Sequence, residues 1–169
     1  MPFYNPEDET YYARAHRNGR DPDQQFDPAE RLFRRYPEAS LVEGKPVPLA
    51  MQFDSGVSVN RAKFSEPQDV LEPDYCEGRH RPGHVVLVLR VFTVPDAIGT
   101  EDRSGRVFQF RLKHTPRETC YPHSEAWCNQ SGDIYQDYEK PPKQVRDKLR
   151  VALARHLGTE NVLRFESYE

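Results

Sequence analysis

The 169-residue sequence lacks any apolar run near the roughly 18 residues that a membrane-spanning helix needs. Its N-terminal stretch, MPFYNPEDETYYARAHRNGR, also lacks the apolar centre of a signal peptide. The chain has no excess of positive charge, because 24 basic and 27 acidic residues give a formal charge of −3. We therefore expect a cytoplasmic protein with no membrane partner, and any attraction to nucleic acid has to be local.

Cysteine and tryptophan are scarce as well. The three cysteines exclude a complete disulfide framework because their number is odd, and a cytoplasmic protein normally keeps its cysteines reduced. A hydrophobic content of 36%, with 9 glycines besides, lies below the roughly 45 to 50% of an average domain, so part of the chain is expected outside the core. The abundance of proline and arginine suggests a bacterial source with GC-rich DNA.

The residues that are present fit one domain preceded by a separate segment. Residues 1–26 carry acidic and aromatic residues without a sustained period of 2 or 3.6, which indicates an irregular N-terminal arm. Its aromatic side chains suit an arm that docks on the body or on a partner, although a loosely packed leader fits equally well. Residues 27–169 are numerous enough to form a single core.

Two segments carry helix signals. Asp27 suits an N-cap and Pro28 suits the first helical position, so the spacing predicts a short helix from Pro28 to Tyr36, which Pro37 ends. A proline pair also opens the second predicted helix, which Gly158 closes and whose apolar residues recur at helical spacing: Val145, Leu149, Ala152, Leu153 and Leu157. We expect both helices to pack on one face of a sheet.

The sheet is predicted from alternation and from β-branched composition. Residues 84–94 (HVVLVLRVFTV) are apolar at both alternations, which predicts a strand buried on both faces. Residues 107–113 alternate and predict a half-buried strand antiparallel to this predecessor. Further strands are predicted near 49–53, 57–60 and 123–128, and from residue 161. The predicted fold is a single α+β domain with a mainly antiparallel sheet.

The stretch HTPRETCYPHSEAWC, residues 114–128, gathers the residue types that carry chemistry. If its second half is a strand, alternate side chains share a face: His123, Glu125 and Trp127 on one side, and Ser124, Ala126 and Cys128 on the other. We expect the small residues to pack inward. The polar pair His123 and Glu125 then faces water, a groove or a partner, and the amphipathic Trp127 beside them completes a candidate binding surface.

One alternative is a small enzyme acting on a phosphate-bearing substrate such as a nucleotide or RNA. Histidine titrates near neutral pH, so His114 and His123 are the candidate general acid and base, with Glu125 orienting a ring. The candidate anion-binding side chains are Arg61, Arg111 and Arg117. No phosphate loop or nucleophile elbow accompanies them, so this interpretation requires the side chains to converge in one pocket.

Another alternative is a zinc-stabilised binding domain. Its candidate ligands fall in two clusters: Cys76, His80 and His84, and Cys120, His123 and Cys128. The spacings differ from paired C-x₂-C knuckles, which favours a packing role for the last two cysteines. A triad of His114, His123 and Glu125 for another metal can also be written, but the leading interpretation requires no cofactor.

A basic stripe completes the candidate surfaces. From Lys140 to Arg155 six basic residues face one acidic residue, and three of the basic residues share one side of the predicted helix: Lys143, Arg146 and Arg150. Such a stripe suits a solvated helix face, a nucleic-acid backbone or an acidic protein surface. We interpret the chain as an interaction module of a larger bacterial system, which contacts a protein partner or nucleic acid through the arm, the stripe and the surface around Trp127.

Overall fold

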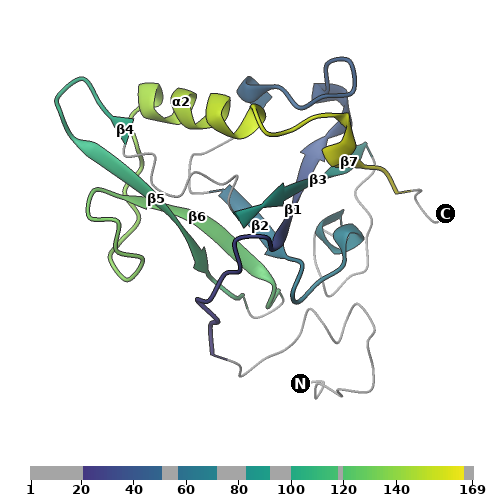
Figure 1. The fold of residues 1–169 in the computed structure, drawn as a ribbon, viewed down its shortest axis with the longest axis horizontal. Coiled ribbons are helices and arrows are strands. Elements are labelled where there is room, and N and C mark those ends of the chain that lie inside the picture. Colours follow the sequence, from purple (N-terminus) through teal and green to yellow (C-terminus); the bar gives the residue numbers. More distant parts are fainter. Residues whose placement is uncertain (1–20, 51–56, 72–82, 92–99, 118–119, 166–169) are drawn as a thin grey trace.

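A single antiparallel sheet of seven strands forms the centre of the molecule (Figure 1). The structure is a computed structural model that describes residues 21–50, 57–71, 83–91, 100–117 and 120–165. The strands follow the order β4-β5-β6-β2-β1-β3-β7 across the sheet. Their bounds are β1 Arg31–Pro37, β2 Val57–Arg61, β3 His84–Arg90, β4 Thr100–Glu101, β5 Val107–His114, β6 His123–Asn129 and β7 Val162–Leu163.

Helix α2, Lys143–Ala154, is the only α-helix in the described ranges, and it lies across one face of the sheet (Figure 1). The remaining helical segments are short 3-10 turns: η1 Glu38–Ser40, η2 Pro48–Ala50, η3 Pro67–Leu71 and η5 Thr159–Asn161. None of these helices is long and apolar enough to cross a membrane. The fold is therefore mainly β, and the predicted α+β domain with two helices on one face is wrong.

The missing helix is the segment predicted from Pro28 to Tyr36, most of which forms strand β1 instead. Its start signals are used in a turn, where the Ala29 N–H donates to Asp27 Oδ1 over 2.7 Å and the Glu30 N–H donates to the Asp27 carbonyl. The apolar spacing that resembles a helix also fits a central strand covered on both faces. Leu32 and Tyr36 join one core cluster and Phe33 joins the other.

Several predicted elements are confirmed. Strands β2, β3, β5 and β6 lie where the alternation predicts them, and α2 buries Val145, Leu149 and Leu153 as expected. The strand expected near 49–53 begins in η2, and its remaining residues lie outside the described ranges, as do residues 1–20 of the predicted arm. The expected antiparallel relation between β3 and β5 is wrong, because the chain of antiparallel pairings from β3 through β1, β2 and β6 makes them run in the same direction.

Two clusters of buried side chains cover the two faces of the sheet. The larger cluster joins α2 to residues of β1, β2, β3, β5 and β6, and it includes Cys128, which is fully buried. The smaller cluster packs η3 against β1 and β3 through Val70, Leu71, Phe33 and Val86. No second cluster of this kind adjoins the outer face of β5 and β6 in the described residues, so that part of the sheet keeps a half-exposed polar face.

Candidate functional site

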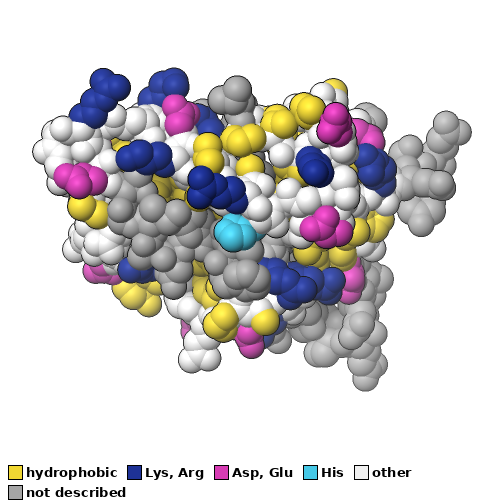
Figure 2. Space-filling view, turned by 45° about the horizontal axis from the view of Figure 1, so that its top comes forward, with side chains coloured by type: hydrophobic (Ala, Val, Ile, Leu, Met, Phe, Trp, Pro, Cys, Tyr) yellow, Lys and Arg dark blue, Asp and Glu magenta, His cyan; other side chains and the backbone are white. Residues whose placement is uncertain are grey.

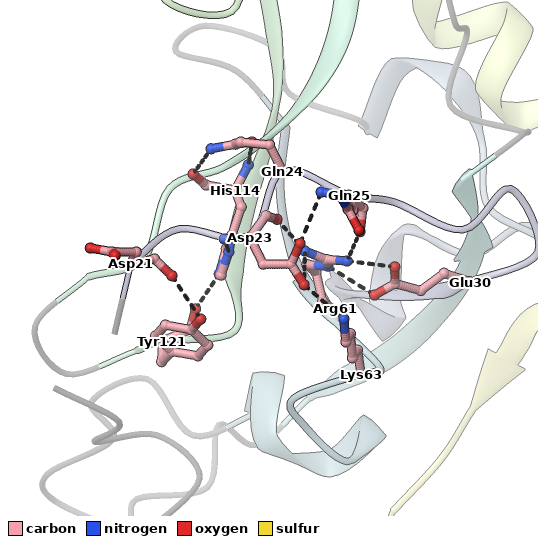
Figure 3. A network of polar contacts seen from close by, with 9 residues as sticks. All are labelled: Asp21, Asp23, Gln24, Gln25, Glu30, Arg61, Lys63, His114 and Tyr121. Atoms are coloured by element: carbon pink, nitrogen blue, oxygen red, sulfur yellow. Dashed lines mark hydrogen bonds and ion pairs between the residues drawn. The ribbon is translucent and has the colours of Figure 1, made fainter. Parts of the chain in front are cut away.

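The strand order brings several of the predicted site residues to one end of the sheet. Because β5, β6 and β2 are adjacent, the last residues of β2 and β5 lie near the first residue of β6. These residues are Arg61, His114 and His123. Arg61 and His114 enclose a segment without helix or strand, residues 21–26, which we call the strap (Figure 3).

The side chain of Arg61 is fully buried, and its guanidinium contacts several groups of the protein. Its guanidinium forms a bidentate ion pair with Glu30, in which Nε donates to Oε1 over 2.9 Å and Nη2 donates to Oε2 over 2.8 Å. Its remaining donors reach two strap carbonyls, with Nη1 2.5 Å from Asp23 O and Nη2 2.6 Å from Gln25 O. This set of partners uses all three guanidinium nitrogens within the protein.

Two aromatic rings enclose the Arg61 guanidinium. Its central carbon lies 4.0 Å from the ring centroid of Phe26 in the strap and 5.1 Å from that of Phe64, which follows β2. A planar guanidinium that stacks on rings and holds a carboxylate bidentately is a typical arginine arrangement that lysine cannot reproduce. The side chain predicted to bind an external anion instead joins the strap to the body.

His114 recognises the main chain of the strap. Its Nδ1 accepts the Asp23 N–H over 2.8 Å, and its Nε2 lies 2.7 Å from the carbonyl oxygen of Tyr121. Acceptance at Nδ1 requires the proton on Nε2, so this ring is neutral. Burial lowers the pKa of His114, and its effect outweighs the hydrogen bond to the Tyr121 carbonyl, which acts in the opposite direction. The Arg61 charge lowers this pKa further.

The strap is held mainly through its peptide groups. The Tyr121 hydroxyl donates to the Asp21 carbonyl over 3.1 Å. The Gln24 side-chain amide accepts a hydrogen bond from the His114 N–H and donates one to the His114 carbonyl. It thus takes the place of a neighbouring strand's peptide group at the end of β5. Lys63 Nζ lies 2.7 Å from the Asp23 carboxylate, and this contact lowers the pKa of Asp23. The strap is thus an ordered part of the body and not a free tail.

His123 has separate partners and is also buried. Its Nδ1 donates to the Thr115 carbonyl over 2.9 Å, which leaves Nε2 as an acceptor for the Ser58 hydroxyl at 3.3 Å. Burial lowers the pKa of His123 to about 4. The expectation that this ring faces outward beside Glu125 is therefore wrong, because Thr115 and Ser58 enclose it.

The two histidines do not form an acid and base pair in this arrangement. The ladder pairs His114 with Ser124, whose side chain points to the face opposite to that of its neighbour His123. Each ring has both nitrogens engaged, and a pKa near 4 makes His123 a weak base toward the Ser58 hydroxyl. Arg117, a predicted anion holder, is exposed in the turn that it closes with Cys120.

The candidate metal ligands are not gathered either. Cys120 and Cys128 are buried free thiols, the second among apolar side chains that raise its pKa to about 12. Cys128 and His123 lie five positions apart on β6 and so point to opposite faces. Cys76 and His80 lie outside the described residues. In the part of the chain that the structure covers, no three His, Cys, Asp or Glu side chains are placed to hold a metal ion.

The outer face of β5 and β6 presents four half-exposed side chains, Arg111, Lys113, Glu125 and Trp127, which we call the Trp127 face. The ladder sets Arg111 opposite Trp127 and Lys113 opposite Glu125. The Lys113 ammonium lies 4.0 Å from the Trp127 ring centroid. Burial raises the pKa of Glu125, although the positive charge of Arg117 acts in the opposite direction.

The indole of Trp127 is held by a contact with a second aromatic ring and by a hydrogen bond from its nitrogen. The ring of Tyr138 meets it edge to face with centroids 5.5 Å apart, and its Nε1–H donates to the Gln136 carbonyl over 2.9 Å. Sequence reasoning identified Trp127 and Glu125 but missed these supporting residues and the Glu30 partner of Arg61. The signal for Glu30 is not local, because the pair is separated by 31 residues.

The basic stripe on α2 is partly neutralised. Lys143 Nζ and Arg150 Nη1 each lie 2.7 Å from the Asp147 carboxylate, and these contacts lower the pKa of Asp147. Arg146, the third residue of the stripe, is half-buried. Figure 2, with the α2 side turned forward, shows Lys and Arg side chains interspersed with acidic and hydrophobic ones. The stripe therefore lacks the continuous positive charge of a phosphate-tracking surface.

Comparison of the chain with protein-family models, with curated proteins and with solved structures finds no match.

Proposed function

We propose that the chain is an interaction module whose protein partner contacts the Trp127 face. The observation that carries this proposal is a half-exposed tryptophan, held in place by Lys113 and Tyr138 on the face of β6 that points away from the larger buried cluster. An aromatic ring fixed before binding loses little conformational entropy when a partner covers it. Tryptophan, tyrosine and arginine are also the residue types that contribute most to binding at protein interfaces.

The charges around Trp127 favour protein over nucleic acid. Lys113 and Arg111 stand beside Glu125, so the surface carries both signs. A phosphate backbone favours surfaces on which lysine and arginine are not opposed by carboxylates. The total charge of −3 and the Asp147 ion pairs on α2 point in the same direction.

The enzyme alternative has less support. It needs His114 and His123 to exchange protons with a substrate, and both rings already bond to protein atoms through each nitrogen. It also needs Arg61 to bind an anion, while the guanidinium is buried against Glu30. A role in positioning the strap accounts for these contacts without a reaction.

Site-specific photocrosslinking in the source cells tests the proposal. A photoreactive residue at Ser58, which is exposed and pairs with Glu125 on the same face, should capture a discrete protein. The matched control is Val151, which is 43% exposed on α2. We expect capture from position 58 alone, and Trp127→Ala should reduce it. Equal capture from both positions, capture unaffected by Trp127→Ala, or capture of nucleic acid would each count against the proposal.

A further inference from the structure

A groove lies beside the Arg61 and Glu30 ion pair, and both of these residues contribute to its lining. Its volume is about 780 Å³, which falls within the roughly 300 to 1,000 Å³ of small-molecule sites. It is open to solvent and lies where the start of β1, the end of β2 and the end of β3 meet. Its charged lining consists of Arg31, Arg61, Lys63 and Arg90 with Asp27 and Glu30.

The acidic groups of this lining are already engaged by the protein. Both Glu30 oxygens accept hydrogen bonds from Arg61, so this buried pair is neutral as a unit. Asp27 Oδ1 accepts the Ala29 N–H of the turn before β1. Lys63 is engaged as well, because its Nζ lies 2.7 Å from the Asp23 carboxylate. Arg31 and Arg90 are the exposed guanidiniums of the lining.

Arg31 and Arg90 are direct partners in the ladder between β1 and β3. Both are exposed, and both belong to the same face of the sheet because directly opposed residues share a face. Two like charges in this arrangement repel each other and destabilise the pairing. The Arg31 guanidinium lies 5.7 Å from the Phe33 ring, and Arg90 Nη1 donates to the Ala29 carbonyl over 3.0 Å, so both are anchored at the groove.

We propose that this groove binds the phosphate group of a small phosphorylated molecule, with Arg31 and Arg90 as the paired donors. A phosphate oxygen pair matches the planar fork of each guanidinium, and its negative charge removes the repulsion between the two arginines. The buried ion pair of Arg61 and Glu30 forms one wall of the groove, and the phosphate binds to the exposed Arg31 and Arg90. This site does not depend on the Trp127 face.

The test measures binding of inorganic phosphate and of pyrophosphate to the full chain by calorimetry and by thermal unfolding. Sodium chloride at matched ionic strength controls for screening. We expect saturable binding with one anion per chain and a rise in the unfolding temperature that chloride does not reproduce. A non-saturating response, or an equal response to chloride, would overturn the proposal.

Two variants decide whether the arginines make the site. Arg31→Gln and Arg90→Gln should each weaken phosphate binding by about tenfold or more, since hydrogen bonds to charged groups contribute roughly 1.5 to 3 kcal/mol. Arg31→Gln should also leave the phosphate-free protein at least as stable as the wild type, because it removes a like-charge pair. Arg103→Gln, at an exposed arginine in the turn after β4, is the matched control and should bind normally. Unchanged phosphate affinity in Arg31→Gln and Arg90→Gln would exclude the site.

Discussion

Replacing Arg61 with methionine removes the side chain that joins the strap to the body while keeping much of its volume. The change leaves the Glu30 side chain, which is 8% exposed, without its charge partner. Breaking a buried ion pair in this way costs about 3 to 5 kcal/mol. The strap carbonyls of Asp23 and Gln25 lose their donors in the same step. With a urea dependence of about 2 kcal/mol per molar, we expect the unfolding midpoint to fall by about 2 M.

The assay is urea denaturation at pH 7 of the wild type, Arg61→Met, Glu30→Gln and the double variant. The buried Glu30 carboxylate destabilises the folded protein mainly when Arg61 is missing. The double variant should therefore be more stable, by about 1 to 3 kcal/mol, than the sum of the two single effects predicts. Arg103→Met, at an exposed arginine, should change stability by less than about 0.5 kcal/mol. A loss below about 1 kcal/mol in Arg61→Met, together with additive single effects, would refute the structural role assigned to Arg61.

Acidification, alkylation and glycine substitution provide three further tests. Burial lowers the pKa of His123 to about 4, whereas the ring titrates near pH 6.5 in the unfolded chain. Below pH 6.5 the unfolded state therefore takes up the proton first, and the free energy of unfolding declines by about 1.4 kcal/mol for each pH unit down to about pH 4. Above pH 6.5 the contribution of His123 to stability is complete. His123→Asn should remove that slope between pH 6.5 and 4, and an unchanged slope would show that the ring is not held neutral. Burial raises the pKa of Cys128 to about 12, so iodoacetamide at pH 8 should label it, by peptide mapping, only as fast as the protein unfolds, and fast labelling of the folded protein would contradict its burial. Gly132 has φ of 73° and a Cβ there would lie 2.5 Å from Gln109 Oε1, whereas Gly83 has φ of 71° with nothing within 4 Å. Gly132→Ala should therefore cost about 1 to 3 kcal/mol in thermal unfolding and more than Gly83→Ala, while equal losses would mean that the Gln109 contact adds nothing.

The sequence predicts elements whose pattern is local. The apolar run at 84–90 and the helical spacing of Val145, Leu149 and Leu153 each identify their element from neighbouring residues alone. The same local patterns predict a helix at strand β1, which is wrong. A strand buried on both faces has no alternation of apolar and polar residues, and the apolar residues of β1 also fit a helical period. The choice between them is made by β2 and β3, which pair with it on either side.

The candidate site divides in the same way. Alternation along β6 correctly predicts that Ser124, Ala126 and Cys128 pack inward and that Trp127 lies on the other side. It does not predict the burial of His123, which depends on Thr115 and Ser58 from other strands. The roles of Arg61 and His114 also depend on contacts with the strap, which is separated from His114 by about 90 positions and carries no periodic signal. Long-range pairs of this kind leave no trace in local spacing.

Trp127 is the only tryptophan in the chain, and it lies on the face that we propose binds a protein partner. The most direct measurement is therefore the affinity between the full chain and the partner that photocrosslinking identifies. Tryptophan emission reports binding to the wild type, and calorimetry reports binding to the variants. Trp127→Ala should weaken binding by about 2 kcal/mol or more, which is roughly thirtyfold, and Lys113→Gln should weaken it by a smaller factor. Lys148→Gln, at an exposed lysine on α2, should leave the affinity unchanged. An unchanged affinity in Trp127→Ala, with a loss in Lys148→Gln, would contradict the account.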